Sequence, residues 1–163
     1  MSRVLLSLTL LVFFPYPALK AQASDCEALY YADAYADHYG VPRALVHAIV
    51  TQESGWKPQA VSNKGAMGLG QLMPRTAANY GVRQPFSKAQ NLRGCVRYLR
   101  DLLDRFHGDM RLAVAGYYAG EDRIARRGLA FSNPDVLAYV EQVRHRYQRE
   151  LLRLAARERT KSR

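Results

Sequence analysis

Several features that define large protein classes are missing from this sequence. It has no long alternating run of β-branched residues, which argues against a mostly β domain. Its four histidines form no HExxH or similar ligand spacing: His38, His47, His107 and His145. We therefore expect no metal ion and no other cofactor. RNP, zinc-finger and basic-zipper patterns are also missing, so no nucleic-acid partner is expected.

Acidic residues are scarce relative to basic ones. The chain has 14 Asp plus Glu against 24 Lys plus Arg, a formal net charge of +10. Such a protein is attracted to polyanions, which outside the cytoplasm are cell-wall polymers and lipid head groups. Much of the excess lies near the C-terminus, where about residues 148–163 are predicted to form a basic helix or tail. The simpler interpretation of this tail is a solvated helix end.

The start of the chain has the pattern of a cleaved secretory signal. Arg3 precedes an apolar run over residues 4–14, then prolines and a small-residue site at residues 21–23. A run of about 11 residues is shorter than the roughly 20 of a membrane-spanning helix, although an uncleaved anchor is an alternative. We expect residues 1–23 to be a signal peptide and residues 24–163 to form one exported, periplasmic, monomeric domain.

Cysteine is nearly absent. Cys26 and Cys95 are the two in the chain, and in an exported protein an even pair is most simply a disulfide. That bond would join the mature N-terminus to a helix in the middle of the domain. Two separate buried thiols are the alternative.

Glycine and proline divide the chain at helix-length intervals, which predicts a mostly α fold. We expect helices within residues 25–40, 41–55, 74–79, 87–108, 109–120 and 133–159, with a short basic turn before the last. The segment from Trp56 to Met73 is too rich in glycine for a helix. It predicts an ordered loop or a small irregular hairpin.

Glu53 interrupts an apolar helix face. The stripe of the second predicted helix consists of Leu45, Val46, Ile49 and Val50. Glu53 is four residues beyond Ile49 and continues this face. Burial and the negative end of the helix dipole both favour the neutral carboxyl and raise its pKa, as general-acid chemistry requires. The alternative is a partly exposed Glu53 paired with Lys57 or Arg75.

The residues that follow, ESGWKPQAVSNKGAMGLGQLMPRTA at 53–77, resemble the catalytic signature of the soluble-type lytic transglycosylases, the SLT family related to goose-type lysozyme. The resemblance continues in NLRGCVRYLRDLL at 91–103 and in Tyr139-Val140, and it covers about residues 31–147. It implies a single lysozyme-like α domain, with the glycine-rich loop directly after the catalytic helix.

The resemblance also implies a reaction. Members cleave the β-1,4 bond between N-acetylmuramic acid and N-acetylglucosamine in peptidoglycan without adding water, which leaves 1,6-anhydromuramoyl ends. It assigns the role of acid and then base to Glu53. No Asp or Glu occurs between Glu53 and Asp101, which suits an intramolecular sugar hydroxyl better than a two-carboxylate scheme. A distant carboxylate can still fold into the site.

Further residues are implied to bind substrate, namely Ser62, Gln71, Met73, Tyr117 and Tyr139. Ser62 and Gln71 would bind the sugar N-acetyl group or hold the acid, or else satisfy loop backbone. Met73 would form an apolar wall or belong to the core. The tyrosines would hydrogen-bond around the acid or the sugar, or be core residues.

One position departs from the family pattern. GYYAG at 116–120 has Tyr118 where the family has Asn, which places a bulky phenol among the inner binding subsites.

The residues and the resemblance together predict a peptidoglycan lytic transglycosylase that remodels the wall locally for an envelope-spanning machine, such as a conjugation or secretion apparatus. The alternatives are a hydrolytic muramidase, which would use the same acid with water, and a non-catalytic glycan-binding assembly protein.

Overall fold

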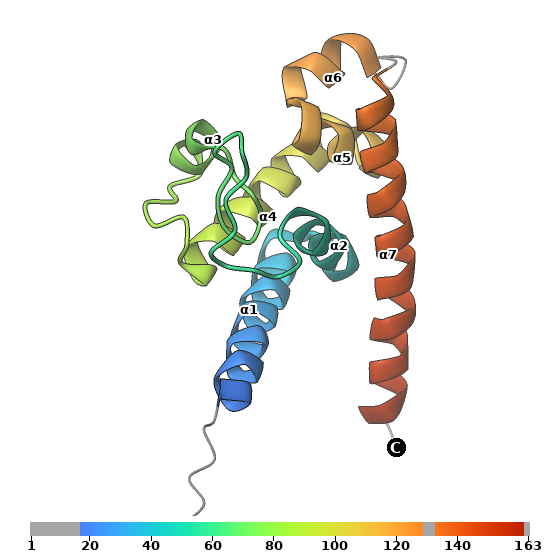
Figure 1. The fold of residues 1–163 in the computed structure, drawn as a ribbon. Helices are drawn as coiled ribbons and strands as arrows, with labels where there is room; N and C mark the ends of the chain where they lie inside the picture. Colours follow the sequence, from blue (N-terminus) through green and yellow to red (C-terminus); the bar gives the residue numbers. More distant parts are fainter. Residues whose placement is uncertain (1–16, 129–132, 162–163) are drawn as a thin grey trace, which may run out of the picture.

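The computed structural model describes residues 17–128 and 133–161, with side chains for residues 26–128 and 133–160. These ranges contain seven helices and no named strand (Figure 1), so the predicted mostly α fold is confirmed. The helices are α1 (Pro17–Tyr39), α2 (Arg43–Glu53), α3 (Pro74–Asn79), α4 (Lys88–Arg105), α5 (Met110–Ala119), α6 (Glu121–Arg127) and α7 (Pro134–Lys161). None of the described helices has the length and apolarity needed to cross a membrane.

The predicted signal peptide is largely outside the described residues. Residues 1–16 are not described, and residues 17–23 form the first turns of α1. Cleavage near Ala23 therefore stays a prediction.

Local capping explains where the helices begin. Ser87 accepts a hydrogen bond from the Gln90 amide at the start of α4, and Asp109 accepts from the amides of Arg111 and Leu112 at the start of α5. The side chain of Asn133 accepts from the Asp135 amide, 2.9 Å away, at the start of α7. These side chains satisfy amides that have no partner inside a helix.

We expected a short basic turn before the last helix. This prediction is wrong, because residues 121–127 form helix α6. Gly120 has φ 91° and separates α6 from α5. Acids occupy the first turn of α6 and bases the last turn, which suits the helix dipole. Ile124, which is 1% exposed, is its one buried residue, too little to give an apolar pattern in the sequence.

The core forms where the helices cross. α1 packs against α4, and α2 packs against α7. Among the described side chains of α1, Ala28, Ala32 and Ala36 are buried in the core, and Tyr31, Tyr35 and Tyr39 pack partly buried against it. The small alanine side chains allow two helices to approach closely. In Figure 1, α7 runs along one side of the molecule, with α2 next to its middle turns.

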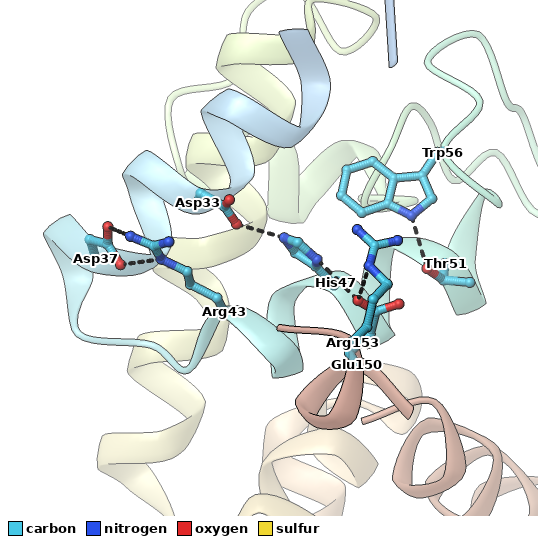
Figure 2. Close-up of polar contacts among 8 residues, drawn as sticks. All are labelled: Asp33, Asp37, Arg43, His47, Thr51, Trp56, Glu150 and Arg153. Carbon is cyan, nitrogen blue, oxygen red and sulfur yellow. Dashed lines mark hydrogen bonds and ion pairs between the residues drawn. The ribbon is translucent and has the colours of Figure 1, made fainter. Parts of the chain in front are cut away.

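A buried histidine links three of these helices (Figure 2). His47 on α2 is 1% exposed; its Nε2 lies 2.7 Å from Oδ1 of Asp33 on α1, and its Nδ1 lies 3.4 Å from Oε2 of Glu150 on α7. The Trp56 ring meets the imidazole edge-on at 5.4 Å, and its Nε1 donates to Thr51 Oγ1 at 2.9 Å. The cluster gives a buried polar group its partners and joins α2 to α1 and α7.

The predicted disulfide between Cys26 and Cys95 is wrong, because both thiols are free. Cys95 is fully buried on α4, where the hydroxyl of Tyr117 lies 3.3 Å from its Sγ and Gly70 passes over it. Burial raises the pKa of the Cys95 thiol to about 12. Cys26 is exposed on α1, so the alternative of two buried thiols holds only for Cys95.

Candidate active site

The glycine-rich segment after α2 forms the expected small irregular hairpin. Isolated antiparallel bridges join Val61 to Met67 and Met67 to Leu72. Its glycines allow close contact with α4. A Cβ at Gly68 would lie 2.3 Å from both the Pro85 carbonyl oxygen and Asn91 Nδ2, and Gly68 has φ +75°. A side chain at this position would clash and also strain the backbone.

Asn91 holds the loop against α4. It is 1% exposed; its Oδ1 accepts from the Gly70 amide at 2.7 Å, and its Nδ2 donates to the Met67 and Pro85 carbonyls at 3.0 and 2.8 Å. No role was predicted for Asn91 from the sequence. The available signal was an amide on the apolar face of the helix predicted within residues 87–108.

Glu53 is the last residue of α2 and faces this loop. The neighbouring Ser54 Oγ donates to the Leu69 carbonyl at 2.8 Å and so fastens the helix end to the loop. Glu53 is partly buried, and burial raises the pKa of its carboxyl from the ordinary 4.5 to about 7. No described residue forms an ion pair with Glu53, so the alternative pairing with Lys57 or Arg75 is wrong.

Tyr139 on α7 supplies a hydrogen bond to this acid. Its hydroxyl donates to Glu53 Oε1, and this bond opposes the effect of burial on the pKa of Glu53. Tyr139 itself is 6% exposed, and burial raises the pKa of its hydroxyl well above the ordinary value. The hydroxyl therefore remains a donor across the neutral range.

Two more contacts join α2 to α7 beside the acid. Gln52 donates through Nε2 to Gln142 Oε1 at 2.8 Å, and Arg146 Nε donates to Gln52 Oε1 at 2.8 Å. Together with the contact of His47 with Glu150, they form what we call the α2–α7 seam. The seam holds Glu53 and Tyr139 in a constant relative position.

A cleft of about 410 Å³ opens in front of Glu53. It brings together six of the seven residues predicted for catalysis or substrate binding: Glu53, Ser62, Gln71, Met73, Tyr117 and Tyr118. The seventh, Tyr139, contacts the acid without being among the residues that line the cleft. The remaining lining is Lys64, Ala66, Ala119, Arg123, Asn133, Asp135 and Val136.

Ser62 and Gln71 hold the shape of the loop. Ser62 Oγ accepts from the amides of Ala66 at 3.0 Å and Lys64 at 3.3 Å. Gln71 Nε2 donates to the carbonyls of Ala60 at 3.0 Å and Gly68 at 2.9 Å. The alternative role of these two residues, hydrogen bonding to the loop backbone, is therefore observed. Both side chains also line the cleft.

Tyr117 bonds the loop rather than the acid. Its hydroxyl donates to the Gly70 carbonyl at 2.5 Å, and burial raises the pKa of this hydroxyl well above its ordinary value. Met73 is 44% exposed and presents an apolar side chain to the cleft.

Tyr118 stacks on the tyrosine that contacts the acid. The ring centroids of Tyr118 and Tyr139 are 4.6 Å apart with an interplanar angle of 24°. Tyr118 is 46% exposed and lines the cleft. Its phenol therefore covers Tyr139 on one side and offers a flat surface to the cleft on the other.

A second carboxylate, Asp135, also lines the cleft. It lies in the first turn of α7, far from Glu53 in the sequence. Glu53 is therefore not the only carboxylate in the cleft, although no Asp or Glu occurs between Glu53 and Asp101 in the sequence. Asp135 was missed because its proximity depends on how α7 crosses α2.

The fold and the site define a helical domain with a protonatable glutamate at the end of a helix, facing a glycine-rich loop. The chain belongs to the family described as the Transglycosylase SLT domain, whose profile matches residues 30–135.

Relatives and solved structures agree with this family. The chain is 39% identical over 90 residues to a transglycosylase of Enterobacteria phage PRD1, covering 55% of this chain and 34% of that protein. It is 38% identical over 91 residues to membrane-bound lytic murein transglycosylase F 1 of Alkalilimnicola ehrlichii, covering 52% of this chain and 18% of that protein. The chain thus spans 34% and 18% of the length of these two relatives.

Two solved structures share the fold. The 70 kDa soluble lytic transglycosylase of Escherichia coli superposes with a TM-score of 0.68 at 22% identity, covering 83% of this chain and 29% of that chain. An inactive mutant of the lytic transglycosylase Slt of Pseudomonas aeruginosa gives 0.62 at 24% identity, covering 82% and 25%.

Proposed function

We propose that this protein is a peptidoglycan lytic transglycosylase. It cleaves the β-1,4 bond between N-acetylmuramic acid and N-acetylglucosamine and forms 1,6-anhydromuramoyl ends. The proposal is supported by membership of the SLT family and by a glutamate with the required properties in a cleft that glycan can enter.

The observation that carries the proposal is the environment of Glu53. A pKa of about 7 leaves a large fraction of this carboxyl protonated near neutral pH, so it can donate to the glycosidic oxygen as the bond to the anomeric carbon breaks. The resulting carboxylate then takes the proton of the muramoyl 6-hydroxyl while that oxygen bonds to the anomeric carbon. The acid is regenerated and no water is consumed.

The cleft residues have matching roles in this scheme. Tyr139 keeps a donor on the carboxyl oxygen and stabilises the anion formed after proton transfer. Tyr118 and Met73 provide exposed flat and apolar surface for sugar rings. The loop residues Ser62 and Gln71 hold the shape of the loop that lines the cleft.

Analysis of reaction products tests the proposal. Purified sacculi are digested with wild-type protein and with Glu53→Gln, and the soluble products are analysed by mass spectrometry. Wild type is expected to release anhydro ends, and the amide variant to release none. Equal release of products by the two proteins would eliminate Glu53 as the acid, and release by neither would favour a non-catalytic glycan-binding role.

Asp135 supports a second candidate function, a hydrolytic muramidase. Its presence in the cleft offers a carboxylate that can activate water, as in a two-carboxylate glycosidase. The Asp135→Asn variant separates the two functions. A transglycosylase keeps most of its activity and its anhydro products, whereas a hydrolase loses its reducing-end products.

We further propose an exported, monomeric protein that acts at the cell wall, with a signal peptide cleaved near Ala23. The basic part of α7 would hold it at anionic wall or membrane surfaces, or dock it to an envelope-spanning machine of the conjugation or secretion type. Cell fractionation and size-exclusion chromatography of the exported protein test this setting. Retention in the cytoplasm would contradict it.

A further inference from the structure

Tyr118 lies between the catalytic cleft and the tyrosine that contacts the acid. It lines the cleft and is 46% exposed, whereas Tyr139 does not line the cleft and is 6% exposed. The two rings are stacked, with their centroids 4.6 Å apart and 24° between their planes. Since only the outer of these two rings reaches the cleft, Tyr118 separates Tyr139 from the water that fills the cleft.

The two tyrosines stand on different helices that pack against each other. Tyr118 is in the last turn of α5, and Tyr139 is on α7, which contacts α5. The hydroxyl of the adjacent Tyr117 donates to the Gly70 carbonyl at 2.5 Å and so fastens the end of α5 to the glycine-rich loop. This bond gives the Tyr118 ring a defined place over Tyr139.

The acid depends on being kept away from water. Burial has the largest effect on the Glu53 carboxyl and raises its pKa to about 7. The Tyr139 hydroxyl donates to this carboxyl. Water admitted beside this hydrogen bond would solvate the carboxylate and favour the charged form. A ring that covers Tyr139 on the cleft side therefore helps to keep Glu53 protonated.

We propose that Tyr118 is a positioning residue that keeps water away from the hydrogen bond between Tyr139 and Glu53. The inference rests on the proposed function, because it concerns the acid of glycan cleavage. It is distinct from a contact of Tyr118 with a sugar ring. A sugar contact forms only when glycan binds, whereas water exclusion acts on the free protein.

The two roles of Tyr118 affect different parts of a pH profile. Loss of a sugar contact lowers kcat/KM at every pH. Loss of water exclusion moves the alkaline limb, which is the fall of kcat/KM as the acid ionises. The position of this limb reports the ionisation of the protein before glycan binds.

The test compares Tyr118→Ala with two matched variants. Tyr118→Ala removes the ring, and Tyr118→Phe keeps it. Met73→Ala removes an apolar side chain of similar exposure, 44%, from the same cleft, but Met73 stands at the start of α3 instead of on α5 or α7. Because both positions are partly exposed, all three variants should fold. For each protein, kcat/KM on solubilised glycan is measured from pH 4.5 to pH 9.

The alkaline limb of Tyr118→Ala should move to lower pH by about one unit, because water then reaches an acid whose pKa is raised by burial. A midpoint of about 6 instead of about 7 leaves about ninefold less protonated acid at pH 8 and nearly the same amount at pH 5. The limb should stay in place in Tyr118→Phe and in Met73→Ala, although Met73→Ala should lower kcat/KM at every pH.

Three results would overturn the proposal. An unmoved limb in Tyr118→Ala would leave sugar contact as the role of this ring. A limb that moves to higher pH would mean that Tyr118 only holds the Tyr139 hydroxyl on the acid, since that bond lowers the pKa of Glu53. An equal shift in Met73→Ala would show that any opening of the cleft hydrates the acid.

A titration without glycan separates this inference from catalysis. The carboxyl carbon of Glu53 is followed by NMR from pH 4.5 to pH 9 and is assigned by its absence from the spectrum of Glu53→Gln. Its midpoint should be lower in Tyr118→Ala than in wild type and unchanged in Tyr118→Phe. Equal midpoints in wild type and Tyr118→Ala overturn water exclusion by this ring. Failure of wild type to cleave glycan, with midpoints that differ as expected, overturns the proposed function instead.

Discussion

Replacing Glu53 by Gln should make the protein more stable above neutral pH, even though it should abolish activity. Burial raises the pKa of this carboxyl from 4.5 to about 7. The folded state thus keeps a proton that the unfolded chain releases near pH 4.5. Raising the pH from 4.5 to 7 consequently favours unfolding. A glutamine side chain has the same shape and still accepts from Tyr139, but it never ionises.

The size of the effect follows from the pKa shift. At 1.36 kcal/mol per pKa unit, the shift corresponds to a loss of about 3 kcal/mol of wild-type stability between pH 4.5 and pH 8. The Glu53→Gln variant should not undergo this loss. The difference in free energy of unfolding, variant minus wild type, should therefore be about 3 kcal/mol larger at pH 8 than at pH 4.5.

Urea unfolding at pH 4.5, 6 and 8 measures this difference, since all other titrating groups are common to both proteins. Glu141→Gln is the control, because Glu141 is exposed and Arg144 lowers its pKa. Its substitution should lower stability at pH 8 relative to pH 4.5, the opposite sign. A Glu53→Gln difference that is flat across this range would mean that the carboxyl is hydrated, and it would refute the burial argument.

Three further predictions concern the surroundings of the acid. Tyr139→Phe removes a hydrogen bond that lowers the pKa of Glu53. The alkaline limb of the pH–activity profile, expected near pH 7, should therefore move to higher pH. A shift to lower pH would contradict the assignment of this limb to Glu53. Gly68→Ala should destabilise the protein by at least about 2 kcal/mol more in urea unfolding than Gly65→Ala, because both have positive φ but nothing lies within 4 Å of a Cβ at Gly65. Asn91→Ala should cost about 3 kcal/mol in the same assay, since it leaves buried loop amide and carbonyl groups without partners; a loss below 1 kcal/mol would show that water replaces the amide.

The features that could be predicted from sequence depend on neighbours in the chain. Ser87 and Asp109 cap the helices that follow them through contacts within three residues. The position of Glu53 on the buried side of α2 follows from the helical period alone. The loop could be recognised from its glycines, because only glycine tolerates both positive φ and the contact distance seen at Gly68.

The features that could not be predicted depend on the crossing of distant helices. Asp135 reaches the cleft because α7 packs across α2, and neither its spacing nor its surroundings in the sequence indicate this. The predicted disulfide was wrong for a similar reason. Counting thiols in an exported chain favours a bond, but the core around Cys95 is closed by Gly70 and Tyr117 while Cys26 lies on the surface.

The α2–α7 seam limits how this protein can vary in length. Tyr139 and Glu150 stand on one helix about three turns apart, and each must meet a fixed partner on α2, Glu53 and His47 respectively. One residue inserted between them would rotate Glu150 by about 100° away from His47. Fusions and truncations of the basic tail should therefore begin beyond Glu150, where α7 no longer determines the geometry around the acid.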